Sequence, residues 1–169
     1  MEALVSFVTT HLTGLLSKDA IVFIISLMPI LELRGGLLAS SLLGVPYLRA
    51  LILCIVGNLL PIPLILLFIE KIVLACEHFG PTQGIARKLR EKVEKNQASI
   101  QKYDFWGLVL FVGIPLPGTG AWTGSLVAGL LHMPRKKSFL AIIVGVLLAS
   151  VIMSIVSYGV LGALGALIQ

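Results

Sequence analysis

Glu32 and Arg34 are the residues whose types and spacing point most directly to chemistry. They lie two positions apart in MPILELRGGLLAS, residues 28–40, with apolar sequence on both sides. Ionisable side chains at membrane depth are costly and usually belong to ion or substrate pathways. A carboxylate there can take up and release a proton, whereas a guanidinium stays charged and can bind an anion. We therefore predict that Glu32 is a proton-coupling site; a static Glu32–Arg34 ion pair is the structural alternative.

A second stretch, GIPLPGTGAWTGS at residues 113–125, carries no charge but is rich in proline and glycine. Unwound segments of this kind can coordinate ions or anionic groups through backbone dipoles. The alternative is a tight turn that lets two helices pack closely. We predict that both stretches, together with an asparagine in an apolar helix between them, bind substrate. The predicted residues are Arg34, Gly35, Gly36, Asn58, Pro117, Gly118, Thr119, Gly120, Trp122 and Thr123.

The composition indicates an all-α integral membrane protein. Of the 169 residues, 57% are hydrophobic and 12% are charged, whereas soluble domains carry roughly 25% charged residues. Cys54 and Cys76 give neither a disulfide framework nor a metal-binding spacing, and no catalytic triad or zinc-protease motif is present. We therefore expect no enzymatic activity, no cofactor, no metal and no nucleic-acid partner.

Hydropathy divides the chain into segments of unequal length. Residues 3–16 predict an amphipathic helix within an interfacial segment 1–19. Residues 50–69 and 138–156 are long enough to span a bilayer, which takes about 20 residues. The apolar arms beside Glu32, residues 20–31 and 37–45, are too short to span alone. This segment is therefore either one kinked spanning helix or a re-entrant hairpin with the charges at its tip.

The two halves of the chain can be superimposed in sequence with an offset of 88 residues. The matched pairs are Pro29 and Pro117, Gly36 and Gly124, Leu38 and Leu126, Pro46 and Pro134, and Gly57 and Gly145. We predict one membrane domain, residues 1–169, with repeats at 20–75 and 105–169, each a re-entrant hairpin followed by a transmembrane helix. Since each repeat crosses the membrane once, the two would be inverted, as in many secondary transporters.

The basic residues favour the hairpins over full spans. Nine of the 13 lysines and arginines fall in residues 76–104 and 134–137, which only the hairpin arrangement puts on one side of the membrane. The positive-inside rule then makes the 76–104 linker cytoplasmic. Within it, Arg87 and Glu91, and likewise Arg90 and Glu94, have the i,i+4 spacing of a charged surface helix.

The stretches PILELRGG (29–36) and IPLPGTGAWTGS (114–125) resemble the family of small multidrug export proteins over nearly the whole chain. A looser similarity extends to the DedA superfamily of membrane lipid transporters. Pro29 and Glu32 match the first loop of that superfamily, and Pro117 and Gly118 match the second. Where the second DedA loop has an arginine, this sequence has Gly120. The DedA resemblance implies a phosphate head group paired with Arg34, whereas the export-protein name implies a cationic drug paired with Glu32.

We expect a small, multi-pass secondary transporter or flippase of the cytoplasmic membrane, coupled to protons. Its substrate would be amphiphilic: a lipid phosphate such as undecaprenyl phosphate, or small drugs. Membrane lipids would surround it, and a homodimer would help so small a protein enclose a cavity. The alternative is a non-transporting membrane scaffold or assembly factor in which Glu32 and Arg34 form a structural pair.

Overall fold

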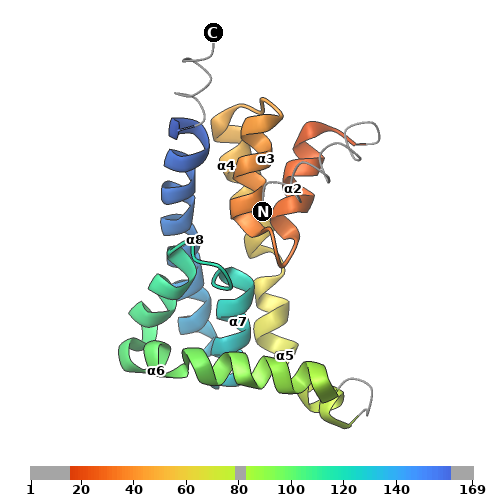
Figure 1. Ribbon diagram of the computed structural model, residues 1–169, viewed down its shortest axis with the longest axis vertical. Helices are drawn as coiled ribbons and strands as arrows, with labels where there is room; N and C mark the ends of the chain where they lie inside the picture. The colour runs from red at the N-terminus through yellow and green to blue at the C-terminus, as the bar shows by residue number, and fades with distance from the viewer. Residues whose placement is uncertain (1–15, 79–82, 161–169) are drawn as a thin grey trace. The chain divides into compact units, whose positions relative to one another are not determined.

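The protein is built from helices arranged in two compact units. Figure 1 shows its computed structural model, in which residues 16–78 and 83–160 are described; these residues form helices and no strand. One unit contains the chain up to Leu60 together with the chain from Val146 onward, and the other contains Pro61–Gly145. The amphipathic helix predicted for residues 3–16 lies, apart from Leu16, outside the described residues.

The first unit is a helical hairpin packed against a third helix. Its elements are α2 (Lys18–Leu27), α3 (Glu32–Leu42), α4 (Tyr47–Leu59), the end of α8 (Arg135–Ser154) and the π-helix η2 (Ile155–Val160). Lys18 Nζ, at the start of α2, donates to Leu43 O after the end of α3 at 2.8 Å, so α2 and α3 are antiparallel. The Tyr158 hydroxyl joins η2 to this hairpin through Ser40 Oγ at 2.8 Å and Val45 O at 3.2 Å.

The second unit is also built from α-helices. Its elements are α5 (Ile62–His78), α6 (Gln83–Gly113), α7 (Ala121–Leu130) and the first part of α8. A kink at Asp104, with φ 47° and ψ −113°, divides α6 into a polar first part and the apolar helix Asp104–Gly113. Arg87 and Glu91 of the polar part form the predicted i,i+4 ion pair at 3.5 Å.

Helix boundaries recur between the two halves with the predicted offset. The helices α3 and α7 end at Leu42 and Leu130, and the helices α4 and α8 begin at Tyr47 and Arg135. Both pairs of positions are 88 residues apart. The turns between these helices also correspond, because Gly44 and His132 both have positive φ, at 66° and 53°. The equal spacing supports a structural repeat, while its inverted orientation and the re-entry of the hairpins into the membrane stay predictions.

The hydrogen bonds and ion pairs around these turns recur as well. Val45 N donates to Ser40 O at 2.9 Å, and Met133 N donates to Ala128 O at 3.0 Å. An ion pair then connects the first helix of each half to the start of its third. These pairs are Asp19 with Arg49 and Asp104 with Lys137. The two turns therefore make corresponding backbone hydrogen bonds, and each unit has an ion pair between its first and third helices.

The prediction of one constant offset is wrong for the first helix of each half. The helix α2 ends at Leu27 and α6 ends at Gly113, which are 86 residues apart. The connection that follows covers residues 28–31 in the first half and 114–120 in the second. Pro29 and Pro117 therefore lie in loops of different length.

Glycines allow the helices of each half to approach closely. A Cβ atom on Gly57 would lie 2.9 Å from the Phe23 carbonyl oxygen of α2, and one on Gly145 would lie 2.9 Å from the Val109 carbonyl oxygen of α6. Phe23 and Val109 are 86 residues apart, the offset of the helices that carry them. Small residues at helix contacts are typical of membrane proteins, where van der Waals packing holds helices together.

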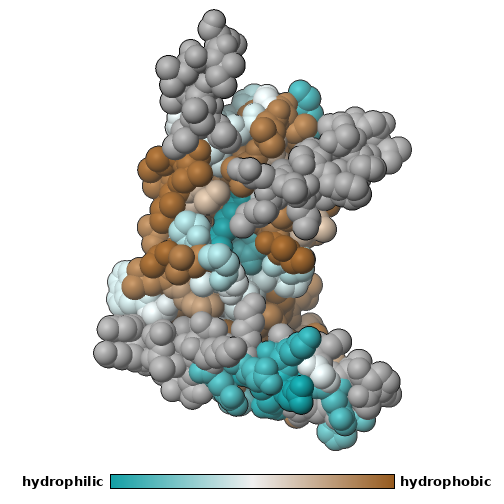
Figure 2. Space-filling view, viewed as in Figure 1, coloured by the Kyte–Doolittle hydropathy of each residue, from teal (hydrophilic) through white to brown (hydrophobic). Residues whose placement is uncertain are grey.

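Two apolar stretches of the described chain are long enough to cross a membrane. They are Tyr47–Cys76, with a mean hydropathy of 2.6, and Arg135–Gly159, with a mean hydropathy of 2.9. Both are longer than the sequence predicted. Only 33% and 39% of their most apolar 18-residue windows are buried, whereas a helix in the core of a soluble protein is buried. Figure 2 shows apolar surface on the C-terminal part of α8 and polar surface along the first part of α6.

The close glycine contacts predict a stability difference between alanine variants. Gly57→Ala and Gly145→Ala each place a methyl group against a backbone oxygen that cannot rotate away. We expect each to lower the free energy of unfolding by about 1–3 kcal/mol, measured by thermal unfolding in detergent. Gly84→Ala is the matched control, since its Cβ would meet nothing within 4 Å and alanine favours a helix. An unchanged melting temperature for Gly57→Ala and Gly145→Ala would contradict this packing.

Candidate functional site

Glu32 and Arg34 lie in the first turn of α3, directly after the short connection from α2. Both are buried, with 5% and 6% of their surface exposed. The Glu32 charge acts favourably on the Arg34 guanidinium, so the pair offsets part of the large cost of burying either charge alone.

The backbone of Glu32 has an unusual conformation. Its φ is +52°, in the left-handed region, although it is not a glycine. Such residues cost of order 1–3 kcal/mol each and cluster at functional sites. Gly120, 88 residues later, also has positive φ, at 128°. The second half thus has a glycine at its positive-φ position, whereas the first half keeps a glutamate there despite the strain.

Gly35 and Gly36 follow the charged pair and face other parts of the same unit. A Cβ on Gly36 would collide with the Ser26 side chain of α2 and lie 2.8 Å from the Cys54 sulfur of α4. A Cβ on Gly35 would lie 2.6 Å from Leu31 Cβ. The structure therefore gives both glycines a packing role that holds the charged turn in place. Their predicted contact with substrate stays a prediction.

Asn58, next to the close-packed Gly57 on α4, is 3% exposed. Its Oδ1 atom accepts no hydrogen bond from the residues that the structure describes. A buried acceptor without a donor costs about 1–3 kcal/mol, so Asn58 carries an unused capacity to accept a hydrogen bond in an apolar helix.

The second loop is held by its own hydrogen bonds. The Thr119 hydroxyl lies 3.0 Å from Ile114 O and 2.9 Å from Leu116 O and donates within the loop. Gly118 reverses the chain with φ 83°, and both Pro117 and Gly118 are exposed. The structure therefore gives Thr119 a role in shaping the loop, while Pro117 and Gly118 are exposed at the surface of their unit.

The helix α7 begins directly after this loop. Gly120 is its N-cap and accepts a hydrogen bond from Gly124 N at 2.8 Å. Trp122 is half-buried and Thr123 is buried in the first turn. Glu32, Arg34, Gly35, Gly36 and Asn58 thus belong to the first unit, and Pro117–Thr123 belong to the second. That the two loops form one site stays a prediction.

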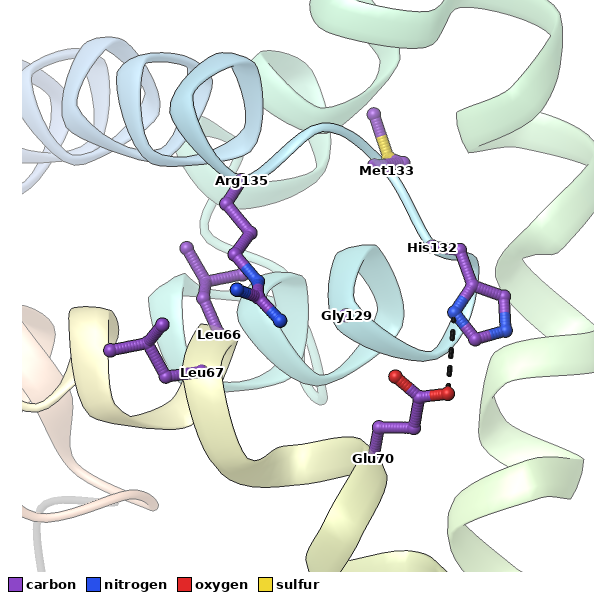
Figure 3. Close-up of a pocket in the computed structure, with 7 residues that line it drawn as sticks. All are labelled: Leu66, Leu67, Glu70, Gly129, His132, Met133 and Arg135. Atoms are coloured by element: carbon purple, nitrogen blue, oxygen red, sulfur yellow. Dashed lines mark ion pairs between the residues drawn. The ribbon is translucent and has the colours of Figure 1, made fainter.

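A polar pocket that the sequence analysis missed lies within the second unit (Figure 3). It has a volume of about 150 Å³ and contains Glu70, His132 and Arg135 beside Leu66 and Leu67. Figure 3 shows the imidazole of His132 turned toward Glu70, with Nδ1 at 3.7 Å from Oε1. His132 follows Gly44 by the offset of 88, and this correspondence is the sequence signal that could have drawn attention to it. In the described residues no group of three or more His, Cys, Asp or Glu side chains could hold a metal ion.

Comparison with protein-family models matches residues 32–152 to the family described as "Putative small multi-drug export protein". This match covers more than two thirds of the chain and begins at Glu32 itself. The chain belongs to this family. A search of curated proteins and a search of solved structures give no match.

Family membership agrees with the helices that the structure shows. As a member of the small multi-drug export proteins with two apolar helices of spanning length, the chain is a membrane protein. The family description indicates a transporter rather than an enzyme. The similarity to the DedA superfamily is independent of this match and stays a prediction.

Exchanging the charges of Glu32 and Arg34 tests whether stability requires only two opposite charges or a carboxylate at position 32 itself. We expect Glu32→Gln and Arg34→Gln each to lower the free energy of unfolding by about 3–5 kcal/mol, because each leaves one buried charge without its partner. The double variant Glu32→Arg/Arg34→Glu restores opposite charges and should recover most of the lost melting temperature. Thermal unfolding in detergent measures this. Equal instability of the double and single variants would contradict a pair that stabilises the turn.

Proposed function

We propose that the protein is a small secondary transporter of the cytoplasmic membrane that couples substrate movement to protons through Glu32. The observation that carries the proposal is a buried carboxylate kept at a positive φ, where the corresponding position of the other half has glycine. Strain retained at such a position points to a requirement for the side chain itself. Family membership supports export as the direction of transport.

Glu32 can couple a proton to a cationic substrate because both bind to the same carboxylate. When it is ionised it attracts a cationic amphiphile, and when it is protonated it releases that cation. A proton taken up from outside would thus replace a drug cation on the same oxygen atoms. Arg34 keeps its charge throughout and opposes permanent protonation of the carboxylate, so that the site can cycle.

Arg34 extends the proposal to an anionic substrate. A guanidinium binds phosphate through two parallel hydrogen bonds, so a lipid phosphate such as undecaprenyl phosphate would pair with Arg34. Protonation of Glu32 would then leave Arg34 as the dominant charge and favour the anion. The unused Asn58 acceptor, in the same unit as Arg34, is a polar group offered to the remainder of the substrate.

The second candidate is a non-transporting membrane scaffold. The observation that favours it is the burial of both charges beside one another, which is also the arrangement of a static pair. In that case the ion pair would fix the turn between α2 and α3, and no flux would depend on it. Transport and stability therefore need to be measured on the same variants.

Transport by purified protein in liposomes tests the primary proposal. We expect an imposed proton gradient to drive movement of a fluorescent cationic dye or of labelled undecaprenyl phosphate. Glu32→Gln should reduce the rate at least about tenfold and abolish its dependence on the gradient, since the amide cannot exchange a proton. Glu70→Gln is the matched control, because this carboxylate lies outside the site and is largely exposed.

The Glu32→Arg/Arg34→Glu variant completes this experiment. A scaffold role predicts that it behaves like the native protein in every assay, whereas the proposed role predicts a folded protein that transports nothing. Arg34→Gln separates the two substrate classes, because it should impair lipid-phosphate transport more than dye transport. Proton-dependent flux that survives Glu32→Gln would refute Glu32 as the coupling site.

The proposal includes a topology with the basic segments in the cytoplasm and a homodimer that encloses the substrate path. In a background lacking Cys54 and Cys76, we expect Lys88→Cys and Lys136→Cys to react with a membrane-impermeant thiol reagent from the cytoplasmic side. Leu48→Cys, at the other end of the first spanning stretch, should react from outside. All three side chains are exposed. Labelling of Lys88→Cys and Lys136→Cys from opposite sides would contradict the hairpin arrangement.

A further inference from the structure

An apolar groove with two basic residues lies within the second unit. It has a volume of about 240 Å³ and is lined by Pro63, Leu66 and Leu67 of α5 and by Arg135, Lys136 and Phe139 of α8. None of these residues belongs to the Glu32 site. The groove shares Leu66, Leu67 and Arg135 with the pocket of Figure 3, so Arg135 lies between two adjoining hollows.

The two basic side chains at the groove have no partner among the described residues. The neighbouring Lys137 forms an ion pair with Asp104, and Glu70 pairs with His132. Arg135 and Lys136 make no such contact in the part of the chain that the structure describes, and both are exposed. They therefore present two exposed positive charges beside an apolar surface, which is the complement of an anion attached to a hydrocarbon chain.

The sequence positions of the lining residues order the groove by depth. Arg135 and Lys136 are the first residues of a spanning stretch, where side chains reach the level of lipid head groups. Phe139 lies about one turn further along α8. On α5, Pro63 lies about one turn further than Leu67 from the polar residues Glu70 and Lys71. On α8 the lining thus changes from charged to apolar in the direction that leads into the bilayer, and on α5 the lining is apolar and lies on the bilayer side of Glu70 and Lys71.

We propose that this groove binds an anionic phospholipid, with the phosphate on Arg135 and Lys136 and one acyl chain along Pro63, Leu66, Leu67 and Phe139. Arginine binds phosphate oxygens in a bidentate manner and lysine adds a point charge. A zwitterionic lipid would bring its own cation to the same place and gain less. The bound lipid is a partner of the folded protein and not its transported substrate, so the inference does not depend on the proposed function.

Lipid-dependent thermal unfolding in detergent tests the assignment. Added phosphatidylglycerol should raise the melting temperature of the native protein more than phosphatidylcholine does. The Arg135→Gln/Lys136→Gln variant should bind phosphatidylglycerol roughly 25-fold more weakly, from about fivefold for each basic residue near an anionic head group. Lys71→Gln/Lys88→Gln is the matched control, since it removes the same charge from exposed residues outside the groove.

A second variant and a second ligand keep the test decisive. Leu67→Trp fills the groove without changing charge and should also weaken phosphatidylglycerol binding. Glycerol phosphate, which has the anion but no acyl chain, should give little stabilisation. The proposal is overturned if the Arg135→Gln/Lys136→Gln variant responds like the control, if phosphatidylcholine stabilises equally, or if glycerol phosphate reproduces the whole effect.

Discussion

Close approach of helices at glycine is the constraint on which the rest of the structure depends. In each half, the third helix contacts the first at a position where a side chain would meet a backbone oxygen: Gly57 at Phe23 and Gly145 at Val109. The first helices are too short to cross a bilayer by themselves, since α2 covers only Lys18–Leu27. Packing against a longer apolar helix is what fixes them. The connection after each first helix is then held in place, and it carries the unusual residues.

The two connections have the same place in their units but different chemistry. The first is short and ends at Glu32, which keeps a strained backbone and a buried charge beside Arg34. The second is longer and uncharged, with Gly120 at the matching position and a threonine that closes the loop on itself. A shared scaffold thus supplies one ionisable turn and one neutral turn. This asymmetry places the proton chemistry that we propose in the first half alone.

The sequence predicted the helical class and the membrane character, because these depend on hydropathy. The predicted offset of 88 recurs in the ends of α3 and α7 and in the starts of α4 and α8, while the inverted repeat stays a prediction. The sequence singled out Glu32 and Arg34 because charges in apolar sequence are costly, with a static pair as the alternative to a proton-coupling carboxylate. It could not predict that α2 and α6 follow an offset of 86, because a loop insertion changes the register without changing composition. The Glu70–His132 pocket was missed because its two halves are 62 residues apart and come together only through packing.

The polar groups around Glu32 and those around Arg135 differ in burial, which implies two different kinds of ligand binding. In the first unit Glu32, Arg34 and Asn58 are buried, and the Asn58 oxygen has no donor among the described residues. A ligand that supplies a proton or hydrogen bond to these groups gains from the low local dielectric. Around Arg135 the charges are exposed at the start of a spanning helix, where water and head groups screen them. Binding at the first place would therefore depend on protonation and on the exact ligand. At the second it would depend on lipid charge and on ionic strength.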